Sequence, residues 1–147
     1  MDLKELYRDV ILDHNRSPRH FGRLEPADAT ARGNNPLCGD ELTVTLRTDG
    51  DRIADLRFEG RGCAISVASA SLMSEAVKGM TRKQFADLYA RVHEVLTHHD
   101  AEVPEELGKV AALAGVRDFP ARVKCATLSW HTLAAALRDA REPVSTE

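Results

Sequence analysis

The spacing of apolar residues predicts a helix at the start of the chain and β-strands after it. Residues 2–15 place apolar side chains at helical intervals, so we expect an amphipathic helix there. Apolar and polar positions then alternate in two runs, 42–46 and 53–58, with Asp49-Gly50 between them. This pattern is typical of a β-hairpin. A further short strand is expected near residues 29–32.

The rest of the chain returns to helical spacing. We expect helices over about residues 63–78 and 81–96, the second of them capped by Thr81. A short helix beginning at Pro104, a loop over residues 115–120 and a final helix over about residues 121–140 should follow. The tail, residues 142–147, is expected to be disordered. A helix, then strands, then several helices indicates an α+β fold in which the helices cover a small antiparallel sheet.

The length, composition and charge of the chain indicate a single globular domain and argue against nucleic-acid and membrane binding. The chain has 147 residues, which favours one domain over residues 1–147, and its 43% hydrophobic and 29% charged residues are typical of a globular protein. A net charge of −3 gives no basic field for nucleic acid. The N-terminus carries no apolar signal segment, and no stretch approaches the ~18–20 apolar residues that a membrane span needs. We therefore expect a cytoplasmic protein with no nucleic-acid or membrane partner.

The candidate chemistry lies in three cysteines, Cys38, Cys63 and Cys125. An odd number in a reducing compartment argues against a disulfide framework. Cys63 is expected at a helix N-terminus, where the helix dipole favours the thiolate. With Asp40, which lies two residues after Cys38, the three thiolates would offer four donors, a set that suits tetrahedral zinc or a thiolate-held iron–sulfur cluster.

The spacing alone leaves another interpretation open. Free cysteines are often buried as small apolar residues, and long gaps between metal ligands are weak evidence for a shared site. From the residues alone, three unrelated core cysteines therefore remain an alternative.

The sequences around the cysteines are more specific. Three segments occur in order: Asn35-Pro36-Leu37-Cys38-Gly39-Asp40, Gly60-Arg61-Gly62-Cys63-Ala64-Ile65-Ser66-Val67-Ala68-Ser69-Ala70-Ser71 and Lys124-Cys125-Ala126-Thr127-Leu128. Together with Leu6-Tyr7-Arg8-Asp9-Val10-Ile11 they resemble the IscU/NifU N-terminal family over nearly the whole chain, to about Leu137. The resemblance implies iron–sulfur cluster assembly, a three-stranded antiparallel sheet covered by about five helices, and metal ligation by Cys38, Asp40, Cys63 and Cys125.

Within that family, the chain is more similar to the SufU-type branch than to the IscU-type scaffolds. Lys124 precedes the third cysteine where IscU-like proteins carry a histidine. The stretch between Cys63 and Cys125 is longer, with the extra piece around residues 98–116, and the Leu-Pro-Pro-Val-Lys segment read by a chaperone is missing. The resemblance thus implies a zinc-dependent sulfur acceptor that works with a SufS-type cysteine desulfurase and supplies a downstream SUF cluster-assembly scaffold.

The resemblance also implies a role for Cys38. A histidine of the desulfurase replaces Cys38 on zinc, and the freed thiolate accepts persulfide sulfur. By position, Arg61, Arg122 and Lys124 are candidates to offset the negative charge of the site or to contact the partner, although exposed cations are often only solvated surface. Two alternatives stay open: a scaffold that assembles an iron–sulfur cluster on Cys38, Cys63 and Cys125, and a module whose zinc is purely structural. Whether such an acceptor is an enzyme in its own right is left open.

Overall fold

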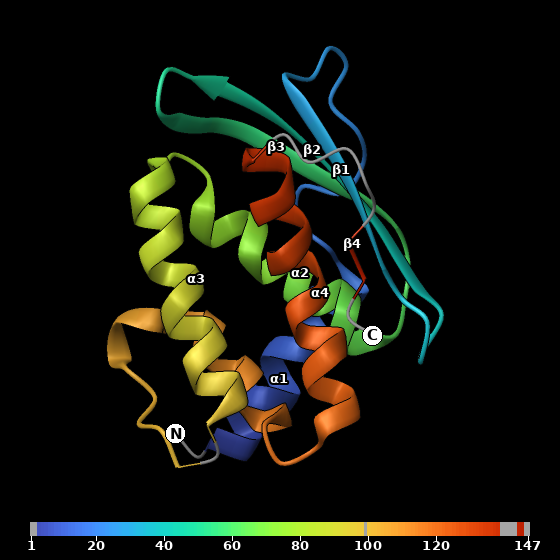
Figure 1. Ribbon diagram of the computed structural model, residues 1–147. Coiled ribbons are helices and arrows are strands. Elements are labelled where there is room, and N and C mark those ends of the chain that lie inside the picture. Colours follow the sequence, from blue (N-terminus) through green and yellow to red (C-terminus); the bar gives the residue numbers. More distant parts are fainter. Residues whose placement is uncertain (1–2, 99, 139–143, 146–147) are drawn as a thin grey trace.

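The computed structural model describes residues 3–98, 100–138 and 144–145, in which a sheet forms one side of the fold and the helices the other (Figure 1). In chain order the elements are α1 (Leu3–Arg16), β1 (Ala29–Asn35), β2 (Asp40–Asp49), β3 (Arg52–Arg61), α2 (Ala64–Val77), α3 (Arg82–Thr97), the 3₁₀ helix η1 (Glu105–Val116), α4 (Pro120–Leu137) and β4 (Val144–Ser145). The expected α+β fold, with five helices and a three-stranded antiparallel sheet, is confirmed for the described residues.

The sheet is built on the predicted hairpin. β2 and β3 pair antiparallel, with Gly50 in the connecting turn at φ 60°. β1 pairs antiparallel with β2 and extends to Asn35, beyond the expected end of this strand at Arg32. Pairing with β2 supplies hydrogen bonds that the Gly- and Asn-rich sequence gave no reason to expect. In the tail predicted to be disordered, Val144–Ser145 form a two-residue parallel strand beside β1, and the other residues from 142 onward lie outside the described part.

The helix boundaries follow local sequence signals, with one exception. Thr81 begins α3 with a capping box in which it exchanges hydrogen bonds with Gln84, as its position predicted. Pro120 stands in the first turn of α4, where its missing N–H costs nothing. The exception is η1, which continues to Val116 although we expected a loop from Gly115. Its turns are 3₁₀ and are interrupted at Gly108, whose φ of 57° breaks the helix.

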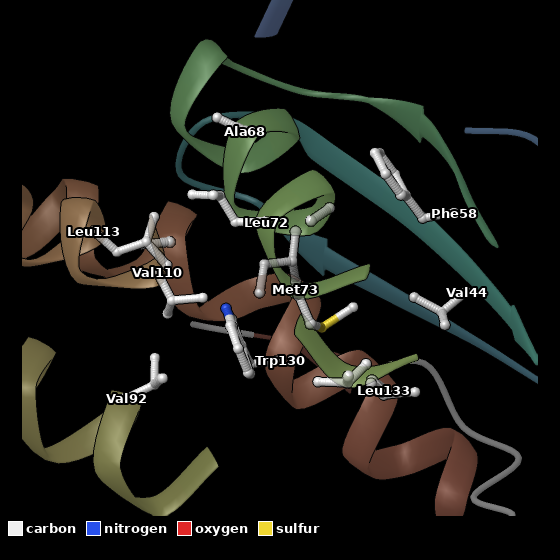
Figure 2. Close-up of a cluster of buried hydrophobic side chains, with 14 of the residues drawn as sticks. Val44, Phe58, Ala68, Leu72, Met73, Val92, Val110, Leu113, Trp130 and Leu133 are labelled. Atoms are coloured by element: carbon white, nitrogen blue, oxygen red, sulfur yellow. The ribbon is translucent and has the colours of Figure 1, made fainter. Parts of the chain in front are cut away.

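All the helices lie on one side of the sheet (Figure 1), where α4 and α2 pack against the strands and α1, α3 and η1 pack outside them. The apolar core fills the space between these layers. Figure 2 shows Met73 of α2 on the side of Val44 and Phe58 from the sheet, Leu72 on the side of Leu113 and Val110 of η1, and Trp130 of α4 near the middle. No helix in the described part is both long and apolar enough to cross a membrane.

One polar side chain in this helical layer gives a test of pH dependence. His14 of α1 is fully buried, its Nδ1 lies 2.7 Å from Ser71 Oγ on α2, and its Nε2 lies 3.4 Å from Glu75. Burial lowers the pKa of His14 below its usual 6.5, helped by Arg19 and opposed by Glu75. Because the unfolded chain then binds the proton more readily, stability is complete above pH ~6.5 and falls as the pH drops toward the depressed pKa of the folded state.

We therefore expect the free energy of unfolding of the metal-free protein to fall more between pH 7.5 and pH 5 than that of a His14→Gln variant. The difference is about 1.4 kcal/mol for each unit by which the pKa is depressed, measured by urea unfolding. The exposed His98, replaced by Gln, is the matched control and should behave as the unmodified protein. Equal pH dependence in the unmodified protein and His14→Gln would contradict the assignment.

Candidate metal centre

Three segments that are far apart in sequence meet at one end of the sheet. The first is the turn between β1 and β2, which carries Cys38. The Cys38 N–H donates to the Asn35 carbonyl at 3.2 Å, and Gly39 adopts φ 71°, a left-handed conformation that favours glycine. Asp40 follows as the first residue of β2 and is fully buried. The turn therefore presents a thiol and a carboxylate two residues apart.

The second segment is the junction between β3 and α2. Cys63 is the N-cap residue of α2, and its Sγ accepts a hydrogen bond from the Ser66 N–H at 3.5 Å. Its own N–H donates to Asp40 Oδ1 at 2.8 Å, which joins the second segment to the first. A Cβ on Gly62 would lie 3.0 Å from that same oxygen, so the close approach of the two segments depends on a residue without a side chain.

The third segment is the first part of α4, which brings in Cys125. This residue is fully buried, and its Sγ lies 3.4 Å from Cys38 Sγ. One ligand atom from each of Cys38, Asp40 and Cys125 falls within 4.8 Å of the others, and Cys63 Sγ lies 3.9 Å from Asp40 Oδ2. All four residues singled out in the sequence thus converge, with Cys38 exposed, Cys63 half-buried, and Asp40 and Cys125 buried.

The electrostatics of this cluster favour a cation. Burial raises the pKa of Cys125, and hydrogen bonds with the Cys38 and Cys63 thiols and the negative charges of Cys63 and Asp40 raise it further. A divalent cation among these groups would reverse that balance, because thiolates are the form that binds metal. Three sulfurs and one carboxylate oxygen fit tetrahedral zinc, and the same thiols suit an iron–sulfur cluster. The four ligand groups therefore fit a metal centre, and they are compatible with either zinc or an iron–sulfur cluster.

Sequence reasoning missed Asn35, which belongs to the same site. This residue is fully buried, and its amide nitrogen lies 3.3 Å from Asp40 Oδ2 and 3.5 Å from Cys125 Sγ. Asn35 lies in the same sequence motif as Cys38, but its residue type alone does not indicate a role. The usable signal was a polar residue at the end of a strand, immediately before a turn that carries a ligand.

The three cations predicted near the site differ in their surroundings. Arg61 forms an exposed ion pair with Glu41 at 3.4 Å, so part of its charge is already matched. Arg122 is exposed and lies close enough to Tyr7 for its guanidinium to oppose the rise in the Tyr7 pKa that burial causes. Lys124 is half-buried on α4, next to Cys125 in sequence. All three are neighbours of ligand-bearing segments along the chain.

Comparisons with known proteins agree with this site. The family model of the NifU-like N-terminal domain matches residues 6–139. The chain is 42% identical over 132 residues to the zinc-dependent sulfurtransferase SufU of Bacillus subtilis (strain 168), covering 90% of this chain and 89% of that protein. It is 40% identical over 136 residues to the iron–sulfur cluster assembly scaffold protein IscU of Streptococcus pyogenes serotype M1, covering 92% and 85%.

A solved structure also resembles the chain over most of its length. The crystal structure of a candidate iron–sulfur cluster assembly scaffold protein for the SUF system, from Fervidobacterium islandicum AW-1, superposes with a TM-score of 0.83 at 35% identity. The superposition covers 90% of this chain and 97% of that one. The family match, the similar relatives and the shared fold lead to one conclusion: the chain belongs to the NifU-like N-terminal domain family of iron–sulfur cluster assembly proteins.

Proposed function

We propose that this chain is a zinc-dependent sulfur acceptor that receives persulfide sulfur on Cys38 from a SufS-type cysteine desulfurase. The observation that carries the proposal is the unequal exposure of the four donors: Cys38 is open to solvent, while Asp40 and Cys125 are buried. A thiol that must meet a partner's sulfur has to be reachable, and Cys38 meets that condition best. The similarity to the zinc-dependent sulfurtransferase SufU supports the same choice.

The residues that would hold zinc are Cys38, Asp40, Cys63 and Cys125. When bound, zinc would keep the cysteines deprotonated at neutral pH. The Cys38 thiolate attacks the outer sulfur of the desulfurase persulfide. A bond forms between Cys38 Sγ and that sulfur, the sulfur–sulfur bond of the donor breaks, and the donor cysteine leaves as a thiolate. The exchange needs no added oxidant or reductant and leaves Cys38 as a persulfide.

Two of the segments that carry candidate ligands expose large apolar side chains that suit contact with another protein. Leu37, next to Cys38 in sequence, is 65% exposed, and Phe119, six residues before Cys125 at the start of α4, is 60% exposed. Exposed large apolar side chains next to a reactive group are a common feature of protein interfaces. Arg122 and Lys124 follow on the same helix as possible polar contacts. A downstream SUF cluster-assembly scaffold would then take the sulfur from Cys38.

The test is alanine production by a SufS-type desulfurase given cysteine, a reductant and the zinc-loaded chain. We expect a large acceleration by the unmodified chain and a fall to the rate without acceptor for Cys38→Ser, because the receiving sulfur is absent. Circular dichroism must show that the variant is folded. A folded Cys38→Ser variant that still accelerates the reaction would refute the proposal. An unfolded variant would instead favour a purely structural zinc, because structural metal binding contributes folding energy.

A second candidate function is a scaffold on which an iron–sulfur cluster is assembled. The convergence of three thiols and the 40% identity to the IscU scaffold of Streptococcus pyogenes favour it. Lys124, in the place of a histidine that IscU-like proteins carry, argues against it. Anaerobic reconstitution with iron and sulfide distinguishes the two: a stable visible absorption spectrum that depends on all three cysteines, without acceleration of the desulfurase, would favour the scaffold.

A further inference from the structure

We propose that Asn35 is a positioning residue of the metal centre, whose side-chain amide holds Asp40 and Cys125 in place independently of Cys38. The inference deepens the proposed function and rests on it in one respect, namely that Cys38 is the ligand that leaves. It concerns a residue that does not itself react and that offers no thiol or carboxylate to a metal.

The position of Asn35 follows from strand register. It is the last residue of β1 and pairs directly with Asp40, the first residue of β2. Its Nδ2 lies 3.3 Å from Asp40 Oδ2 and 3.5 Å from Cys125 Sγ. A side-chain amide nitrogen carries two N–H donors. Each donor therefore has one acceptor, and the two acceptors come from different segments of the site.

The amide can face the site in only one orientation without repulsion. Turned over, it would place its carbonyl oxygen against the Asp40 carboxylate and the Cys125 sulfur, which are both acceptors when they are deprotonated. In the orientation present, Asn35 Oδ1 is buried and has no hydrogen-bond partner among the described residues. An unpaired buried acceptor costs stability. The unpaired Asn35 oxygen therefore lowers stability, while both of its N–H donors face candidate ligands. This combination is expected of a residue whose role is to position the ligands.

The hydrogen bonds to the four candidate ligands are unequal. Asp40 accepts on one oxygen from Asn35 and on the other from the Cys63 N–H. Cys63 Sγ accepts from the Ser66 N–H, and Cys125 Sγ accepts from Asn35. For Cys38 Sγ, the contact that the structure records in its described part is with Cys125 Sγ at 3.4 Å. Each of the other three candidate ligands thus accepts a hydrogen bond from a group other than the Cys38 thiol, and these bonds would hold the three in place when Cys38 departs.

The experiment compares Asn35→Ala with Asn34→Ala, its neighbour on β1. Asn34 is half-buried, while Asn35 is fully buried. We expect zinc affinity, measured by competition with a chromophoric chelator, to fall about 10- to 100-fold for Asn35→Ala, the range for lost partners of metal ligands. It should be nearly unchanged for Asn34→Ala. Asn35→Leu fills the space with a branched side chain of the same length but has no donor, so it should weaken zinc binding about as much as Asn35→Ala does.

The order of these variants separates positioning from packing. If Asn35 only fills space, Asn35→Leu should bind zinc better than Asn35→Ala, and that result would overturn the proposal. The cobalt-substituted protein gives a second readout, because its thiolate-to-metal absorption reports ligand geometry; we expect a changed spectrum for Asn35→Ala and an unchanged one for Asn34→Ala.

A measurement on the unmodified protein covers the case in which the Asn35 variants do not fold. Its Asn35 side-chain amide signals, followed by NMR, should shift on addition of zinc, and the lack of any shift would contradict the role. None of these readouts uses sulfur transfer. If the unmodified chain binds zinc through Asn35-supported ligands but does not accelerate the desulfurase, only the proposed function fails. If it accelerates the desulfurase and Asn35→Ala binds zinc normally, only the present inference fails.

Discussion

Replacing Cys125 with serine is expected to lower the affinity for zinc about a hundredfold or more, and more than Cys38→Ser does. A structural zinc site contributes about 10–16 kcal/mol from four ligands, or roughly 3 kcal/mol for each, and every 1.4 kcal/mol is a factor of ten. Cys125 is fully buried, so water cannot readily take its place, whereas Cys38 is exposed and its position can be filled from solvent. Competition with a chromophoric chelator measures both affinities under the same conditions.

The two serine variants also differ in what else they should change. Cys125→Ser is expected to lose most of the rise in melting temperature that zinc gives the unmodified protein, because ligand binding to the folded state stabilises it by mass action. Cys38→Ser should retain much of that rise. Equal losses in the two variants would show that exposure does not distinguish the ligands, and the assignment of Cys38 as the leaving ligand would lose its basis.

Trp130→Ala is expected to lower the free energy of unfolding by about 3–5 kcal/mol, the usual cost of removing a large buried aromatic side chain. Trp130 is fully buried, and its ring is parallel to that of Phe85 with centroids 6.3 Å apart. Its Nε1–H donates to Ser69 Oγ at 3.1 Å, and the Ser69 hydroxyl donates to the Ala126 carbonyl. The substitution would thus open a cavity between α2, α3 and α4 and leave a buried hydroxyl with one partner fewer.

Urea unfolding at a fixed zinc concentration measures this effect, and a fall of about 10 °C in melting temperature should accompany it. Phe119→Ala is the matched aromatic control. The Phe119 side chain is 60% exposed, so its loss should change stability by less than about 0.5 kcal/mol. A Trp130→Ala protein as stable as Phe119→Ala would mean that the core is not organised around Trp130.

The sequence predicted the elements whose signals are local. The alternation before and after Gly50 predicted the β2–β3 hairpin, and Thr81 predicted the start of α3. The extension of β1 to Asn35 escaped prediction, because its pairing partner lies in another strand and its own residues are typical of loops. The interruption of η1 at Gly108, where φ is 57°, was not predicted either, because the spacing of apolar residues does not report backbone dihedral angles.

The candidate metal ligands were predicted from the family resemblance and not from local sequence patterns. The spacing of Cys38, Cys63 and Cys125 in the sequence does not predict that they lie close together in space, because long-range contacts determine the distances between them. Only the family resemblance indicated that they form one site. The structure brings one ligand atom of each of Cys38, Asp40 and Cys125 within 4.8 Å of the others and Cys63 Sγ to 3.9 Å from Asp40 Oδ2, and the ion that they hold stays a prediction. Asn35 was missed because its importance comes from register with Asp40 and from the approach of α4, neither of which the sequence displays.

The paired residues Asn35 and Asp40 close a turn of only four residues, and that turn limits how far Cys38 can travel. Cys38 is two residues from Asp40, so with about 3.6 Å per extended residue its Cα stays within about 7 Å of the Asp40 Cα as long as the strands remain paired. Cys38 therefore cannot act as a swinging arm that carries cargo across a gap between proteins. On the proposed function, a sulfur donor and a sulfur recipient would each have to bind close to this short turn. Because they would compete for the same place, we expect the donor to leave before the recipient can bind.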